Sequence, residues 1–142
     1  MLQAFRDYTS STNLFSSDDR ILLAVSGGVD SMAMVKLFSD AGFDFGIAHF
    51  NFGLRGAESD LDEQFVTKMA AELGVELFTK RIDTAVYAKS KKVSIQMAAR
   101  ELRYSWFDQI CQESGYNYIA TAHHLDDQAE TFFINLLRGT GI

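Results

Sequence analysis

A short glycine-rich segment, SGGVDS at residues 26–31, constrains the fold of this chain more than any other feature. The apolar run before it, residues 21–25, has the length of a buried strand, and apolar residues at helical spacing follow it from about Asp30 to Asp40. Glycines at such a turn let the backbone approach an anion, which the free N–H groups of a helix start attract. The segment therefore predicts a phosphate-binding loop formed by Ser26, Gly27, Gly28, Val29, Asp30 and Ser31.

Two common phosphate loops do not fit this segment. The mononucleotide loop requires a lysine after its last glycine, and the dinucleotide fingerprint G-x-G-x-x-G is also absent. SGGVDS is instead similar to the loop of pyrophosphate-loop enzymes, which cleave ATP between its α and β phosphates. The alternative is a tight turn in which Asp30 or Ser31 caps the helix.

The rest of the chain alternates strands with helices, which predicts a Rossmann-like α/β fold with a parallel sheet and helices on both faces. Such a sheet binds ligands beyond the carboxyl ends of its strands, so the loops at 26–31, 50–57 and 122–127 should meet there. A polar, basic stretch after residue 80 has no assigned element. Strands are expected at 21–25, 43–50, 75–80 and 117–121, and helices at about 2–8, 30–40, 58–73, 94–114 and 126–138.

Length and composition are those of one globular domain, residues 1–142. The single cysteine, Cys111, allows neither an internal disulfide nor a C-x-x-C pair, and no apolar run is long enough to span a membrane. We therefore expect a cytoplasmic protein. A net charge of −6 does not suggest a nucleic-acid binder, although basic clusters occur at Lys80-Arg81 and at Lys89, Lys91 and Lys92.

A second group of polar residues, AHHLDDQAET, follows the fourth expected strand. Asp127 and Glu130 lie three residues apart and share a face of the expected helix. Carboxylates facing a bound polyphosphate need a cation between them, and Mg²⁺ suits oxygen ligands. The alternatives are a helix cap made by Asp126 or Asp127 with Glu130, and a zinc site that includes His123 and His124.

Basic side chains are expected to offset the phosphate charge, because the loop has no lysine. Arg55 lies in the loop after the second strand, where its planar guanidinium could pair with phosphate. Arg100 and Arg103 share one face of the long helix, and either could take this role. Without a ligand, both would form an ordinary solvated helix face. Nine aromatic residues are mostly expected in the core: Phe5, Phe38, Phe43, Phe45, Phe65, Trp106, Phe107, Phe132 and Phe133.

Four motifs in a fixed order make the chain similar to the tRNA(Ile)-lysidine synthetases, and the resemblance covers nearly all of it. The motifs are SGGVDS, HFNFGLRG (49–56), AARELRY (98–104) and AHHLDDQAET (122–131), followed by LLRGTG (136–141). The resemblance implies an ATP-dependent ligase that adenylates the wobble cytidine of an isoleucine tRNA. Free L-lysine then displaces AMP. It also implies that the catalytic domain continues beyond Ile142 and that later domains hold the tRNA.

The same resemblance implies roles for individual residues. Residues Ser26 to Ser31, His49 and Arg55 would bind ATP, and Asp30 and Asp127 would hold Mg²⁺. Asp30, Asp127, Glu130 and Arg103 would form the catalytic set. One departure stands out, because this chain has Phe52 where the family usually carries a second histidine.

Two other functions remain open at this level. A related tRNA sulfur transferase would use the same loop, but such enzymes commonly depend on cysteines, and Cys111 is predicted inside a helix. A non-catalytic nucleotide-binding module would share the fold and would not need the paired carboxylates. The oligomeric state is also open, a homodimer included.

Overall fold

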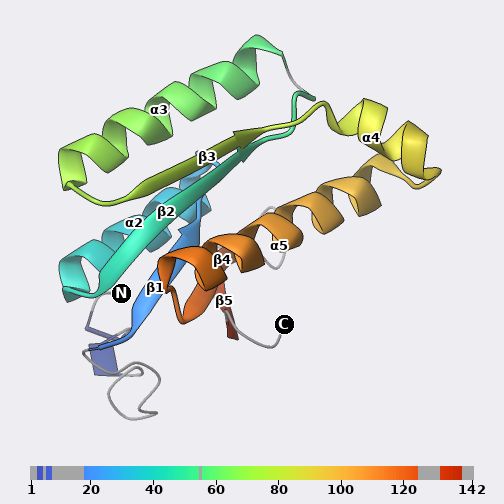
Figure 1. Ribbon diagram of the computed structural model, residues 1–142. Helices are drawn as coiled ribbons and strands as arrows, with labels where there is room; N and C mark the ends of the chain where they lie inside the picture. The colour runs from blue at the N-terminus through green and yellow to red at the C-terminus, as the bar shows by residue number, and fades with distance from the viewer. Residues whose placement is uncertain (1–2, 5, 8–17, 55, 125–131, 139–142) are drawn as a thin grey trace.

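The computed structural model describes residues 3–4, 6–7, 18–54, 56–124 and 132–138, and it has an α/β architecture (Figure 1). A five-stranded sheet has the order β3-β2-β1-β4-β5. The pairs β1–β2, β2–β3 and β1–β4 are parallel, whereas β4–β5 is antiparallel. The strands are β1 (Arg20–Ala24), β2 (Asp44–Asn51), β3 (Leu77–Arg81), β4 (Tyr118–His124) and β5 (Phe132–Arg138).

Helices cover both faces of this sheet, as predicted. Ile21 and Leu23 of β1 pack with Phe38 of α2 and Val66 of α3, whereas Leu22 faces Phe107 of α5 on the other side. This alternation follows from the two-residue period of a strand, and β1 is apolar throughout because both its faces are buried. The helices are α2 (Val29–Ala41), α3 (Ala57–Leu73), α4 (Thr84–Lys91) and α5 (Ile95–Ser114).

The expected helices at 30–40, 58–73 and 94–114 are confirmed to within one residue at each end. All three end at a glycine in the left-handed conformation: Gly42, Gly74 and Gly115. Glycine adopts this backbone conformation without a Cβ clash. The first four strands are confirmed with shifted ends. Residues 3–4 and 6–7, within the short N-terminal helix expected at 2–8, are helical.

One helix was not expected, and one expected helix is wrong. The basic stretch after β3 contains helix α4, which Asp83 begins by accepting a hydrogen bond from the Val86 N–H at 3.2 Å. The helix expected at 126–138 is instead strand β5 over Phe132–Arg138, while residues 126–131 lie outside the described part. β5 pairs with β4 from Tyr118↔Arg138 to His124↔Phe132, so the sheet is mixed rather than wholly parallel. Pairing with β4 satisfies backbone groups of β5 that a helix would satisfy internally.

The order of the strands locates the ligand edge. From β1 the chain moves outward to β2 and β3, and then returns to place β4 on the other side of β1. The order therefore reverses between β1 and β4, and open α/β sheets bind ligands at the carboxyl ends of such a pair. The glycine-rich segment leaves β1 at this position.

Within the described residues, no helix is both long and apolar enough to cross a membrane.

Candidate functional site

The two serines of the glycine-rich loop form hydrogen bonds within the loop. The Gly28 N–H donates to Ser26 Oγ at 3.2 Å, the Gly27 N–H donates to Ser31 Oγ at 3.2 Å, and the two hydroxyl oxygens lie 3.3 Å apart. Gly27 has φ +97°, a backbone conformation that other residues rarely adopt. Two N–H groups thus already point at oxygen atoms, which a phosphate could replace.

The alternative that Asp30 or Ser31 caps the following helix is wrong. Gly28 is the N-cap of α2, and no side chain caps it. The Ser31 hydroxyl instead donates to the Gly28 carbonyl at 3.0 Å and receives the Gly27 N–H. Asp30 lies in the first turn of α2, where a carboxylate is favoured by the helix dipole. The serines therefore shape the loop itself.

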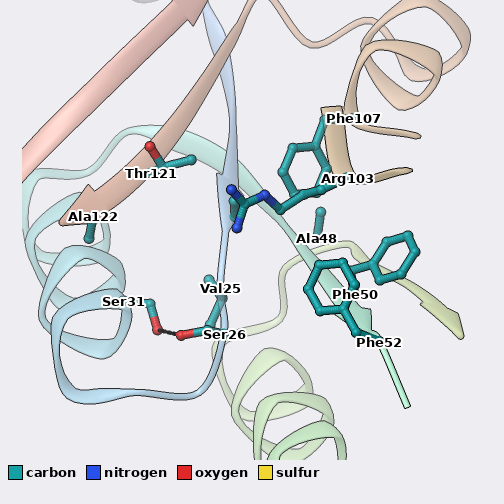
Figure 2. Close-up of a pocket in the computed structure, with 11 residues that line it drawn as sticks. Val25, Ser26, Ser31, Ala48, Phe50, Phe52, Arg103, Phe107, Thr121 and Ala122 are labelled. Atoms are coloured by element: carbon teal, nitrogen blue, oxygen red, sulfur yellow. Dashed lines mark hydrogen bonds between the residues drawn. The ribbon is translucent and has the colours of Figure 1, made fainter. Parts of the chain in front are cut away.

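A cavity of about 180 Å³ lies beside this loop, between the carboxyl ends of β1 and β4 (Figure 2). Ser26 and Ser31 border it from the loop, Thr121 and Ala122 from β4, and Arg103 from α5. Phe50 and Phe52 also line this cavity. Two of the three predicted loops therefore meet the end of β4 at the cavity. The other lining residues are Ala24, Val25, Ala48 and Phe107.

The cavity distinguishes Arg103 from Arg100, which the sequence could not, because only Arg103 lines it. The Arg103 side chain projects from α5 toward the space between β4 and the loop (Figure 2), and its Nε is buried without a hydrogen-bond partner among the described residues. Arg100 is exposed, and its guanidinium lies 5.1 Å from the centre of the Tyr104 ring. A buried N–H of a cation lacking an acceptor is costly unless an anion supplies one. Arg103 is thus better placed than Arg100 to meet an anion in the cavity.

His49 borders a second cavity of about 180 Å³ on the other side of the loop. Its Nδ1 lies 2.8 Å from the Val25 carbonyl oxygen, which can only accept, so this nitrogen carries the proton. In the neutral ring Nε2 is then an acceptor, and it is buried with no partner among the described residues. His49 can therefore receive a hydrogen bond from a ligand hydroxyl or amine. Ser26, Phe50, Asn51, Phe52, Leu54, Ser59 and Asp62 complete the lining.

Sequence reasoning missed three residues of these cavities. Phe50 and Phe52 stack with ring centres 4.4 Å apart, and both border both cavities, a role that the sequence did not indicate. The sequence shows that Phe52 replaces the family's usual histidine. It does not show that the Phe52 ring stacks on Phe50. Asp62 of α3 packs against the loop, because a methyl group added to Gly27 would lie 3.3 Å from its Cβ. Nothing in the sequence pattern distinguished Asp62.

The predicted metal ligands are only partly within the described structure. Asp127, Glu130 and Arg55 lie outside the described residues, as does Asp126 of the alternative cap. His123 and His124 are placed in β4, next to the β1 end. Among the residues that the structure describes, no group of three histidine, cysteine or carboxylate side chains could hold a metal ion. Asp30 alone cannot hold Mg²⁺ without ligands from elsewhere.

Cys111 lies inside α5, as predicted, and is buried. Burial, with a smaller contribution from Asp108, raises the pKa of its thiol to about 11. A protonated, enclosed thiol is a poor nucleophile, so Cys111 is unsuited to sulfur delivery.

Comparison with protein families now decides the classification. The model of the PP-loop domain matches residues 2–142. The chain belongs to the PP-loop family. The glycine-rich loop of this chain fits that classification. It has backbone N–H groups and serine hydroxyls close together, and it contains no lysine.

Curated relatives match most of this PP-loop chain. A tRNA(Ile)-lysidine synthase of Bacteroides thetaiotaomicron is 48% identical over 135 residues, which is 95% of this chain and 32% of that protein. Those of Porphyromonas gingivalis strain W83 (49% identical, 91% of this chain, 29% of that protein) and Parabacteroides distasonis (43%, 100% and 32%) are similar. The chain thus spans about a third of the length of these relatives.

Solved structures with much lower identity share the fold. An NH3-dependent NAD synthetase from Campylobacter jejuni has a TM-score of 0.63 at 16% identity, covering 83% of this chain and 53% of that one. An NMN synthetase from Francisella tularensis has a TM-score of 0.60 at 16% identity, covering 83% and 51%. This likeness supports the Rossmann-like α/β fold.

Proposed function

We propose that this chain is the nucleotide-binding part of a tRNA(Ile)-lysidine synthase. It would bind ATP in the loop cavity, adenylate the wobble cytidine of an isoleucine tRNA and join free L-lysine to that cytidine in the cytoplasm. The observation that carries the proposal is that the glycine loop and Arg103 border the same cavity, and that the buried Nε of Arg103 has no hydrogen-bond partner among the described residues. The names of relatives 43–49% identical over most of this chain support the substrate assignment.

ATP would bind with its phosphates against the loop. The Gly27 and Gly28 N–H groups and the Ser26 and Ser31 hydroxyls would turn from one another to the phosphate oxygens. Arg103 would donate to the same phosphates from the opposite wall, where charge-assisted hydrogen bonds are strong. The neighbouring His49 Nε2 would accept a hydrogen bond from the nucleoside, and the Phe50 and Phe52 rings would contact its apolar surface.

The reaction would proceed in two steps. The cytidine carbonyl oxygen attacks the α phosphorus of ATP and pyrophosphate leaves, so negative charge builds on the leaving group beside Arg103 and the loop N–H groups. The lysine amine then attacks the activated ring carbon and AMP leaves. The amine must lose a proton in this step, for which a nearby carboxylate can serve as the base. We assign this role to Asp127 or Glu130.

Mg²⁺ would neutralise phosphate charge when bound, which is the chemistry that the ion supplies. Asp30 and Asp127 would hold it together with phosphate oxygens and water, because Mg²⁺ normally keeps only one or two protein carboxylates. Arg55 would approach the phosphates from the β2 side. The oligomeric state is not part of the proposal.

Calorimetric titration with α,β-methylene ATP, with and without Mg²⁺, tests the site. We expect binding that requires Mg²⁺ and that weakens in Asp127→Ala. The control Asp44→Ala, at the start of β2 and away from its carboxyl end, should bind like the unchanged chain. Equal affinity of Asp127→Ala and the unchanged chain would remove Asp127 from the site. No binding under any condition would contradict the role of the loop.

A chimera tests the reaction. This chain replaces the matching 135 residues of the Bacteroides thetaiotaomicron enzyme, and radiolabelled lysine entering isoleucine tRNA is measured. We expect lysine incorporation that depends on ATP and is lost in Glu130→Ala. A folded chimera that incorporates no lysine would contradict the proposed function. Formation of a thiolated nucleotide would support the sulfur transferase instead.

A further inference from the structure

The hairpin of helices α4 and α5 is basic, whereas the chain as a whole is acidic. Residues 84–103 carry five basic side chains and one acidic side chain, in a sequence with 13 basic and 19 acidic residues. Lys89, Lys91 and Lys92 at the turn between the helices are all exposed. Positive charge is therefore concentrated on one element, which is the distribution of a local anion-binding surface rather than of a generally basic protein.

Lys92 occupies a backbone position that disfavours it. It caps the C-terminus of α4 with φ +57°, and it is the one non-glycine residue with positive φ among the described residues. Helices α2, α3 and α5 all end on glycine at this position. A side chain in the left-handed region strains the backbone, and such strain persists where another requirement outweighs it. Unlike a glycine, Lys92 places an exposed ammonium group at this position.

The hairpin holds its charges on a rigid frame. Asp83 caps the start of α4, and Ser94 caps the start of α5 by accepting a hydrogen bond from the Met97 N–H at 3.1 Å. Thr84, Ala88 and Ala98 are buried, α4 packs against α5, and the Val93 N–H donates to the Ala88 carbonyl at 3.1 Å. The backbone positions of the exposed lysines are therefore set by the packing and caps of the hairpin.

The hairpin also leads to the loop cavity. It lies beyond the carboxyl ends of β2 and β3, at the edge of the sheet that carries the cavity (Figure 1). Arg103, which borders the cavity, lies on α5 about 12 Å along the helix axis from Ile95. The exposed apolar side chains of Ile95 and Met97 lie between the lysines and Arg103 in the sequence, and unstacked bases could contact them.

We propose that the α4–α5 hairpin is an RNA-docking surface, in which Lys89, Lys91 and Lys92 bind backbone phosphates next to the nucleotide that enters the cavity. The identity of the RNA as a tRNA rests on the proposed function. The surface itself rests on the hairpin charge and on the strained Lys92. Lysines in the last turn of a helix also complement its dipole, which would make them purely structural. The two explanations predict opposite changes in stability and RNA binding.

The test uses the full chain and a triple variant, Lys89→Glu, Lys91→Glu and Lys92→Gly, with Lys68→Glu on exposed α3 as the matched control. Affinity for an isoleucine tRNA transcript with a wobble cytidine is measured over a range of salt concentrations. We expect the triple variant to bind about tenfold more weakly or worse. The slope of log affinity against log salt should fall by roughly two to three, because about 0.7–0.9 is lost for each phosphate contact. Lys68→Glu should change neither value.

A single variant, Lys92→Gly, separates charge from fold. Docking predicts weaker RNA binding with an unchanged or higher urea midpoint, because glycine relieves the strain. Unchanged RNA affinity in both variants would overturn the inference, as would an unchanged chain that binds no RNA at low salt. Poly-L-glutamate that competes as well as the tRNA would also overturn it, because acidic protein would then be an equal partner. Failure of the lysine assay with normal RNA docking would contradict only the proposed function.

Discussion

Arg103 and Arg100 lie one helical turn apart on α5 and differ in burial. Arg103 borders the cavity and has a buried Nε, whereas Arg100 is exposed, and both guanidinium groups lie near the Tyr104 ring. A charge-assisted hydrogen bond contributes about 1.5–3 kcal/mol, so Arg103→Ala should weaken binding of an ATP analogue by roughly 10- to 100-fold. Arg100→Ala should change it by less than about threefold. Calorimetry on both variants checks this, and similar losses in the two would show that the cavity does not select Arg103.

Cys111 should make stability depend on alkaline pH. Its folded pKa is raised to about 11 from an ordinary value of 9.0, so the folded chain keeps a proton that the unfolded chain loses. The stabilisation is fully present below pH 9 and is lost as pH rises from 9 to 11. Urea unfolding between pH 8 and 10.5 should show a steeper decline for the unchanged chain than for Cys111→Ala. Identical slopes would contradict the raised pKa.

Single residues were predictable where their chemistry is local. The loop of residues 26–31 was found because glycine and serine act on adjacent backbone groups, and the turn forms within six residues. His49 and Arg103 also lie beside the loop cavities. Phe52 and Asp62 were missed because their roles depend on contacts with Phe50 and Gly27 from other elements, and no local pattern encodes such contacts.

The packing of α5 and its following turn onto the sheet depends on Gly46 of β2. The buried Tyr116 lies over it and donates a hydrogen bond to Glu76 at 2.7 Å, and a Cβ at Gly46 would collide with the Tyr116 hydroxyl and ring. Gly46→Ala should therefore lower the free energy of unfolding by about 1–3 kcal/mol, as overpacking does. Urea unfolding measures this loss. Tyr116→Phe should recover part of it in the double variant, and simple additivity of the two changes would contradict the collision.

Elements were predictable where both ends carry signals. Helices α2, α3 and α5 show apolar spacing together with a terminal glycine. Helix α4 was missed because it ends on Lys92 and shows little apolar periodicity. The run at residues 132–137 is apolar and rich in aromatic and branched side chains, which suits a strand as well as a helix. Its pairing with β4 decides between them, and that partner lies in another element.

At the scale of the whole molecule, ligand binding and stability should be linked through Gly27. An ATP analogue that binds only the folded chain should raise the free energy of unfolding by about 2.7 kcal/mol at one hundred times its dissociation constant. Gly27→Ala should lose most of this increment, because alanine disfavours φ +97° and would press on Asp62.

Gly42→Ala is the matched control, because Gly42 also has positive φ, at +80°, but no atom lies within 4 Å of an added Cβ. Both variants should lose about 1 kcal/mol of stability without ligand, since each places alanine in the left-handed region. Only Gly42→Ala should keep the increment with ligand. Urea unfolding with and without the analogue measures all four values. A full increment in Gly27→Ala would show that the glycine loop does not hold the nucleotide.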